Sequence, residues 1–140
     1  MNGADPTDRG PRLVAAGLDV AAVLLFVIAG RGSHDEGGGI GMVLEIAAPF
    51  LIGVAVAWLL SPNLAIRPWS VRAGVDVWVV TMVVGMLLRR LVWDRGTALS
   101  FVIVATIVLG VLLVGWRTIW SIARRRRELR SVLPPSKAGR

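Results

Sequence analysis

Cysteine is absent from the 140-residue chain, acidic residues number only nine, and there is a single histidine, His34. Without cysteine there is no disulfide framework, no thiolate nucleophile and no cysteine metal site. His34-Asp35-Glu36 contains metal-ligating residue types, but three consecutive residues beside a triglycine are not a preorganised metal site. Ser33 beside His34 is no catalytic dyad by adjacency alone, because a nucleophile and its base must converge in space. No cofactor motif is present, so the sequence predicts neither an enzyme, nor a metal site, nor a cofactor.

Long apolar runs, by contrast, take up just over half of the chain. They cover residues 13–30, 40–60, 71–88 and 97–116, and hydrophobic residues make up 55% of the sequence. About 20 apolar residues cross the ~30 Å hydrocarbon core as a helix, and about 18 suffice when flanking residues reach the interface. The sequence therefore predicts an all-α membrane protein, a bundle of four antiparallel transmembrane helices joined by short loops.

Basic residues are concentrated after the last apolar run. Residues 117–140 hold eight of the sixteen, and the rest of the chain holds the other eight. Short basic segments stay on the cytoplasmic side, so the C-terminus is predicted to lie inside, and four spans place the N-terminus there too. The chain then divides into a short cytoplasmic tail (1–12), a transmembrane domain (13–116) and a basic cytoplasmic tail (117–140). Because the charge is not spread over a soluble domain, it does not predict nucleic-acid binding.

The predicted inner interface carries aromatic and basic side chains. The run Arg124 to Arg127 can bind anionic lipid headgroups at the inner face of the membrane, although such a run can also merely fix orientation. The N-terminal segment lacks a small-residue cleavage site and is predicted to remain as an anchor. Four of the six tryptophans fall at this interface, as expected for a membrane-embedded bundle: Trp58, Trp69, Trp116 and Trp120.

A short pattern recurs along the chain. Ala16-Gly17-Leu18-Asp19-Val20 returns 57 positions later as Ala73-Gly74-Val75-Asp76-Val77, and the same offset places Gly53 on Gly110. Two tandem helical hairpins, related by an axis along the membrane normal, would produce this recurrence. Coincidence would also produce it, because apolar spans draw on few residue types.

Asp19 and Asp76 lie inside predicted spans, where a charged group costs roughly 2.5 to 3.5 kcal/mol on insertion scales. If the first and third helices face each other, the two carboxylates share one lining and suit proton or cation coupling. Alternatively, both are structural. Arg72 lies four residues before Asp76 on the same helical face, and Arg12 lies two turns before Asp19 with a side chain long enough to reach it.

Glu45 is the third intramembrane ionisable residue. Pro49 lacks the N–H group that would bond the carbonyl of Glu45, so the second helix is predicted to kink there. The carboxylate lies near the predicted outer surface, and its candidate basic partners are Arg31, Arg89 and His34. An outward-facing polar cluster and a single closing ion pair are both compatible with this placement.

Four short features point to a family. With Gly30-Arg31-Gly32-Ser33-His34 closing the first predicted helix, Pro49-Phe50 in the second, Arg89 ending the third and Phe101 early in the fourth, the chain resembles the DUF3054 family. Its members are small, predicted four-helix membrane proteins of bacteria, notably actinobacteria, and of some archaea. The resemblance covers about residues 13–120 and implies a multi-pass protein of the bacterial plasma membrane. It implies no catalytic residues, since the family has no assigned activity.

Two functions from different classes agree with these features. The leading prediction is a non-enzymatic interaction or support component of the inner membrane. The alternative is a small proton- or cation-coupled transporter that uses Asp19 and Asp76. Because the side chains of a small four-helix bundle fill its interior, a pathway would need a homo-oligomer, and small residues such as Gly53 and Ala57 would allow close helix contact within the bundle.

Overall fold

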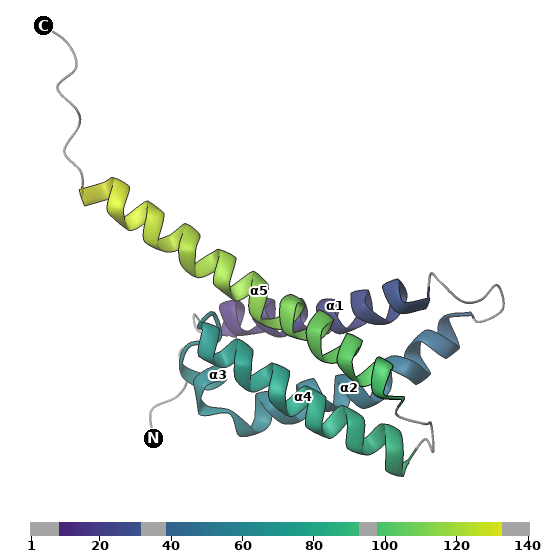
Figure 1. Cartoon of the computed structure of the whole chain (residues 1–140). Helices are drawn as coiled ribbons and strands as arrows, with labels where there is room; N and C mark the ends of the chain where they lie inside the picture. The colour runs from purple at the N-terminus through teal and green to yellow at the C-terminus, as the bar shows by residue number, and fades with distance from the viewer. Residues whose placement is uncertain (1–8, 32–38, 93–97, 133–140) are drawn as a thin grey trace, which may run out of the picture.

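The computed structural model describes residues 9–31, 39–92 and 98–132, and all of its regular elements are helices. Four long helices account for most of this part of the chain: α1 (Arg9–Arg31), α2 (Ile40–Leu60), α4 (Val71–Leu91) and α5 (Leu99–Val132). A fifth, short helix, α3 (Pro62–Ile66), lies between α2 and α4. Successive long helices run in opposite directions, and α5 projects well beyond the other three (Figure 1).

The long helices form a closed four-helix arrangement. α2 packs on α1 and α4, and α5 packs on the same two helices, so α1 and α4 lie diagonally across the bundle. All four are long and apolar enough to cross a membrane, by length and composition. The predicted all-α bundle of four membrane-spanning helices is therefore confirmed, whereas the origin of the two hairpins by duplication stays a prediction.

Helix ends differ from the predicted bounds where polar residues are also good helix formers. α1 begins at Arg9 rather than at residue 13, α4 continues through Leu91, and α5 continues past the last apolar run to Val132. Arginine and glutamate favour helix, so the basic segment after the last apolar run extends α5 instead of breaking it.

The second loop, residues 61–70, contains a helix that sequence reasoning missed. α3 begins at Pro62, which occupies its first turn, where the missing N–H of proline removes no hydrogen bond. Leu64 of α3 is fully buried in the core of the bundle. The loop is therefore a packed cap on one end of the bundle rather than a simple turn.

Small residues bring α2 and α4 into close contact, as predicted for Gly53. A Cβ atom added at Gly53 would lie 2.8 Å from the Cα atom of Thr81, and one at Gly85 would lie 2.6 Å from the ring of Phe50. The ring of Phe50 also packs edge-on against the ring of Phe26. Close approach of this kind supplies the van der Waals contact that holds helices together when lipid surrounds them.

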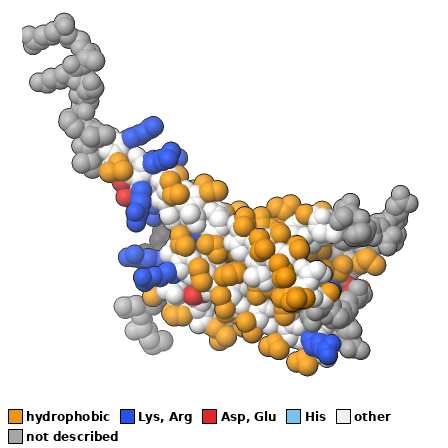
Figure 2. All heavy atoms as spheres, in the orientation of Figure 1, with side chains coloured by type: hydrophobic (Ala, Val, Ile, Leu, Met, Phe, Trp, Pro, Cys, Tyr) orange, Lys and Arg blue, Asp and Glu red, His pale blue; other side chains and the backbone are white. Residues whose placement is uncertain are grey.

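Figure 2 shows apolar side chains covering the visible face of the bundle. Basic side chains gather on the extension of α5 and at the end of the bundle next to that extension. Many large apolar residues along the helices are exposed, including Leu25, Ile28, Val83 and Ile107. An apolar exterior on helices that satisfy their own backbone hydrogen bonds is the arrangement that a bilayer requires. α2 remains helical across Pro49, which is buried, and the predicted kink there stays a prediction.

Candidate functional site

Asp19 lies on the buried face of α1. It occupies the same stripe as Ala15, Val23 and Phe26, at the spacing of three to four residues that places side chains on one helical face. Its side chain is 0% exposed. The local sequence therefore directs a carboxylate into the protein interior and not toward lipid.

Arg117 approaches Asp19 from α5. It follows Ala105, Leu109 and Leu113 at intervals of four residues, and all four side chains are fully buried. The guanidinium group binds the carboxylate with two hydrogen bonds, from Nη1 to Oδ1 at 2.6 Å and from Nη2 to Oδ2 at 2.9 Å. This paired geometry is the strongest form of contact between an arginine and a carboxylate.

Two indole groups complete the coordination of Asp19. Trp58 of α2 donates to Oδ2 at 3.1 Å, and Trp116 of α5 donates to Oδ1 at 3.3 Å. The guanidinium of Arg117 also lies 4.2 Å from the ring centroid of Trp116. Four N–H donors thus surround one buried carboxylate, and they come from two helices that are far from α1 in sequence.

The remaining donors of Arg117 bind backbone. Its Nε donates to the carbonyl of Pro68 at 2.9 Å, and Nη1 also donates to the carbonyl of Leu113. Gly74 makes room for the side chain, since a Cβ atom there would lie 2.8 Å from Cδ of Arg117. We call Asp19, Arg117, Trp58 and Trp116 the buried clamp, which joins α1, α2 and α5 and also holds the segment between α3 and α4.

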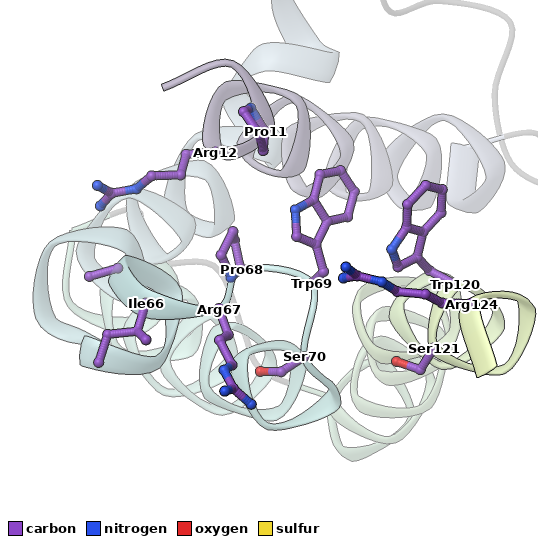
Figure 3. A pocket seen from close by; sticks show the side chains of 11 residues that line it. Pro11, Arg12, Ile66, Arg67, Pro68, Trp69, Ser70, Trp120, Ser121 and Arg124 are labelled. Carbon is purple, nitrogen blue, oxygen red and sulfur yellow. The ribbon is translucent and has the colours of Figure 1, made fainter. Parts of the chain in front are cut away.

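The end of the bundle beside the clamp is hollowed and basic. A pocket of about 660 Å³ is lined by Arg12 of α1, Arg67 at the end of α3, and Arg124 of α5. Trp69 and Trp120 form part of its wall and stack on each other with ring centroids 5.2 Å apart. Figure 3 shows Arg124 extending toward Trp69, Arg67 extending beside Ser70, and Arg12 extending away from Trp69. We call this pocket the basic hollow.

A model of the family described as "Protein of unknown function (DUF3054)" matches residues 16–120. The chain belongs to the DUF3054 family. Comparison with curated proteins and with solved structures gives no match. The part that matches DUF3054 contains both Asp19 and Arg117, so the buried clamp lies inside it, whereas Arg12 and Arg124 of the basic hollow lie on either side of it.

The prediction that Arg12 pairs with Asp19 is wrong. Arg12 is half-buried at the rim of the basic hollow, and the partner of Asp19 is Arg117. Arg117 stands directly opposite on α5, whereas Arg12 would have to reach along two turns of α1. The signal that could have found this pair was the four-residue spacing that puts Arg117 on the buried stripe of α5.

Asp76 has a different environment. It accepts hydrogen bonds from Ser61 Oγ at 2.6 Å and from Asn63 Nδ2 at 2.8 Å, and it thereby holds the start of α3 against α4. Within the described ranges no ion pair joins Asp76 to Arg72, whose side chain is exposed, so the predicted pair is wrong. α3 supplies closer donors that sequence reasoning had not anticipated.

The two aspartates do not share a lining. Asp19 binds groups of α2 and α5, whereas Asp76 binds the residues that connect α2 to α3. The expectation that both face one site is wrong because Arg117 and two indole groups enclose Asp19, whereas Ser61 and Asn63 bind Asp76.

At the opposite end of the bundle, Glu45 is exposed on α2 and Arg89 lies 4.2 Å over the ring of Phe101. The side chain of Arg31 and all of His34 lie outside the described residues, as does the His34-Asp35-Glu36 segment. The predicted cluster around Glu45 therefore stays a prediction. Of the run Arg124 to Arg127, all four side chains are exposed, and Arg124 also lines the basic hollow.

Proposed function

We propose that this DUF3054 protein is a non-enzymatic interaction or support component of the bacterial plasma membrane, with both termini in the cytoplasm. The single observation that carries the proposal is the buried clamp. It uses the one fully buried carboxylate among the described residues to tie helices together, and the groups left available for a partner lie at the basic end of the bundle.

A carboxylate that couples transport must meet a different requirement from a carboxylate that holds helices together. A proton or cation site must exchange its proton or ion, and hence must be reached by water or by the ion. Asp19 is 0% exposed and already accepts four hydrogen bonds, and Asp76 lies in a separate environment. This arrangement supports a structural role for both residues.

The proposed orientation follows from the charges. The basic extension of α5 and the basic hollow lie at the same end of the molecule, and segments rich in arginine are retained in the cytoplasm. A reporter that is active only in the cytoplasm should work when fused after Arg140, and a reporter that is active only outside should work near Gly38. A cytoplasmic position for Gly38 would overturn this orientation.

Reconstitution tests the proposal against its alternative, an oligomeric coupled transporter. Proteoliposomes that contain the wild-type chain should show no more proton, sodium or potassium flux than empty vesicles, under an imposed membrane potential. The two test variants are Asp19→Asn and Asp76→Asn, which each remove one of the candidate coupling carboxylates, and the empty vesicles are the control. Flux above empty vesicles that disappears in Asp76→Asn or Asp19→Asn, with both variants folded, would replace the support function by transport.

A further inference from the structure

The basic hollow brings three arginines to the lining of one pocket. Its three arginines come from three separate parts of the chain, namely α1, the end of α3, and α5. The other lining residues include Ser70 and Ser121, and among the residues that the structure describes none of those lining the hollow is a carboxylate. A planar guanidinium presents paired N–H donors that match the oxygen atoms of a phosphate, so arginines around one hollow favour a phosphate group.

The charge of these arginines is available for a ligand. Neither Arg12 nor Arg67 has a carboxylate within ion-pair distance among the described residues. Arg124 lies 3.9 Å from Glu128, but both side chains are 71% exposed, and such a pair contributes little. Arg67 and Arg124 are exposed side chains with rotatable stems and can turn toward a bound anion.

The floor of the hollow is held in place by the buried clamp. Arg117 donates to the carbonyl of Pro68, the residue between Arg67 and Trp69. Trp69 is also fixed by its contacts with Trp116, at 5.5 Å between ring centroids, and with Trp120. A binding site whose backbone and aromatic wall are already ordered loses less entropy when its ligand binds.

The surroundings of the hollow favour a lipid over a dissolved ion. Two tryptophans line it, and indole side chains concentrate at the level of lipid headgroups. Ile66 lines the hollow and is 76% exposed, and Leu13, next to Arg12, is 72% exposed. Exposed apolar residues beside three arginines present one surface to acyl chains and another to the headgroup.

We propose that the basic hollow binds the phosphate group of an anionic phospholipid, with Arg12, Arg67 and Arg124 as its charged ligands and Trp69 as its wall. The assignment rests on the proposed membrane function and names the partner at the basic end. Basic pockets on the cytoplasmic side of helical bundles are suited to such headgroups.

The test is a titration of the purified full chain in a neutral detergent, followed by native mass spectrometry. The probes are phosphatidylglycerol, zwitterionic phosphatidylcholine and inorganic phosphate. The hollow variant is Arg12→Gln, Arg67→Gln and Arg124→Gln combined. The matched control is Arg125→Gln, Arg126→Gln and Arg130→Gln, which removes the same charge from exposed residues of α5 that do not line the hollow.

We expect the wild-type chain to retain phosphatidylglycerol in preference to phosphatidylcholine. The hollow variant should lose on the order of 100-fold in affinity for phosphatidylglycerol, since each of its three arginines contributes about fivefold and the factors multiply. The control should lose no more than about threefold, because its charges act only through the general field. Circular dichroism checks that both variants are helical, and Arg67→Gln alone, at an exposed residue, should still lose about fivefold if the triple variant does not fold.

Three results would overturn the assignment. Equal losses in the hollow variant and the control would mean that the basic surface acts without a defined site. Displacement of phosphatidylglycerol by millimolar inorganic phosphate would identify a dissolved anion as the ligand. Equal retention of both lipids by the wild type would mean that the headgroup is not recognised. Ion flux in proteoliposomes would instead contradict the proposed function and leave the lipid measurement unchanged, so the two failures are distinguishable.

Discussion

Asp19 and Asp76 occupy the same place in a recurring five-residue pattern, yet the bundle treats them differently. Asp19 is fully buried, is paired with a guanidinium and accepts four hydrogen bonds. Asp76 is only partly buried and accepts its hydrogen bonds from a hydroxyl and an amide, which are neutral groups. One carboxylate takes part in a charge pair inside the bundle, and the other fastens a connecting helix.

The difference shows that a local sequence pattern can place a carboxylate on a helix without determining which groups bind it. Both aspartates stand in the same five-residue sequence pattern on the first helix of a hairpin, and the neighbouring helices then determine their partners. α5 brings an arginine to Asp19 because its buried stripe continues into the basic segment, whereas α3 brings Ser61 and Asn63 to Asp76. The following variants order the consequences from the largest expected effect to the smallest.

The largest effect is expected at the buried clamp. Asp19→Asn should lower the free energy of unfolding by about 3 to 5 kcal/mol, because it leaves Arg117 charged and buried without its counter-ion. Arg117→Gln should cost a similar amount. The double variant should be more stable than the sum of the two losses indicates, with a coupling of about 1 to 3 kcal/mol. Thermal unfolding in detergent, followed by circular dichroism, measures all four proteins, and additive losses would argue against a direct pair.

A smaller loss is expected when one indole donor is removed from the clamp. Trp58→Phe keeps much of the ring packing but deletes the hydrogen bond to Asp19, and hydrogen bonds to charged groups contribute about 1.5 to 3 kcal/mol. The same unfolding measurement applies. In the Asp19→Asn background the loss from Trp58→Phe should shrink, and an unchanged loss there would mean that Trp58 acts through packing alone.

Substitution of Asp76 should lower the free energy of unfolding less than substitution of Asp19. Asp76→Asn retains one acceptor oxygen for Ser61 or Asn63, so we expect a loss of about 0.5 to 1.5 kcal/mol in unfolding free energy. Ser61→Ala provides a matched control, because it removes the hydroxyl donor and leaves the carboxylate in place. A loss at Asp76 as large as that at Asp19 would show that the two environments are not energetically different.

The smallest effect is expected for Arg72→Gln. Its side chain is exposed and does not pair with Asp76, and surface substitutions of this kind usually change stability by no more than about 0.5 kcal/mol. Thermal unfolding of Arg72→Gln alone and together with Asp76→Asn checks this. If Arg72→Gln rescued the stability of Asp76→Asn, the result would support the ion pair between Arg72 and Asp76 that the helical spacing had suggested.

Most of the fold could be predicted from the sequence, because a membrane-spanning helix is encoded by length and hydropathy along one continuous segment. The predicted run at residues 40–60 coincides with α2, and Gly53 allows close packing as expected. α3 was missed, since five residues between two prolines carry no periodic pattern. α5 extends beyond the last apolar run because arginine and glutamate, which are too polar for the membrane, still favour helix.

The site was harder to predict because it depends on contacts between distant segments. The spacing of Arg72 and Asp76 suggested a pair within one helix, but spacing along a helix does not show which face is buried. Arg117 was assigned to the basic tail by its charge, although its four-residue interval from Leu113 marks it as the last member of a buried stripe. The basic hollow combines three segments, and no local motif could have indicated it.

The separation of 98 positions between Asp19 and Arg117 has a consequence for biogenesis. α1 is synthesised first and α5 last, and at ordinary rates of translation the interval is on the order of 5 to 20 s. Throughout that interval the carboxylate of the first helix has no counter-ion from the last. A chain truncated before residue 117 keeps Asp19 without its charged partner, so it should be less stable in the membrane and more readily cleaved by quality-control proteases than the full chain.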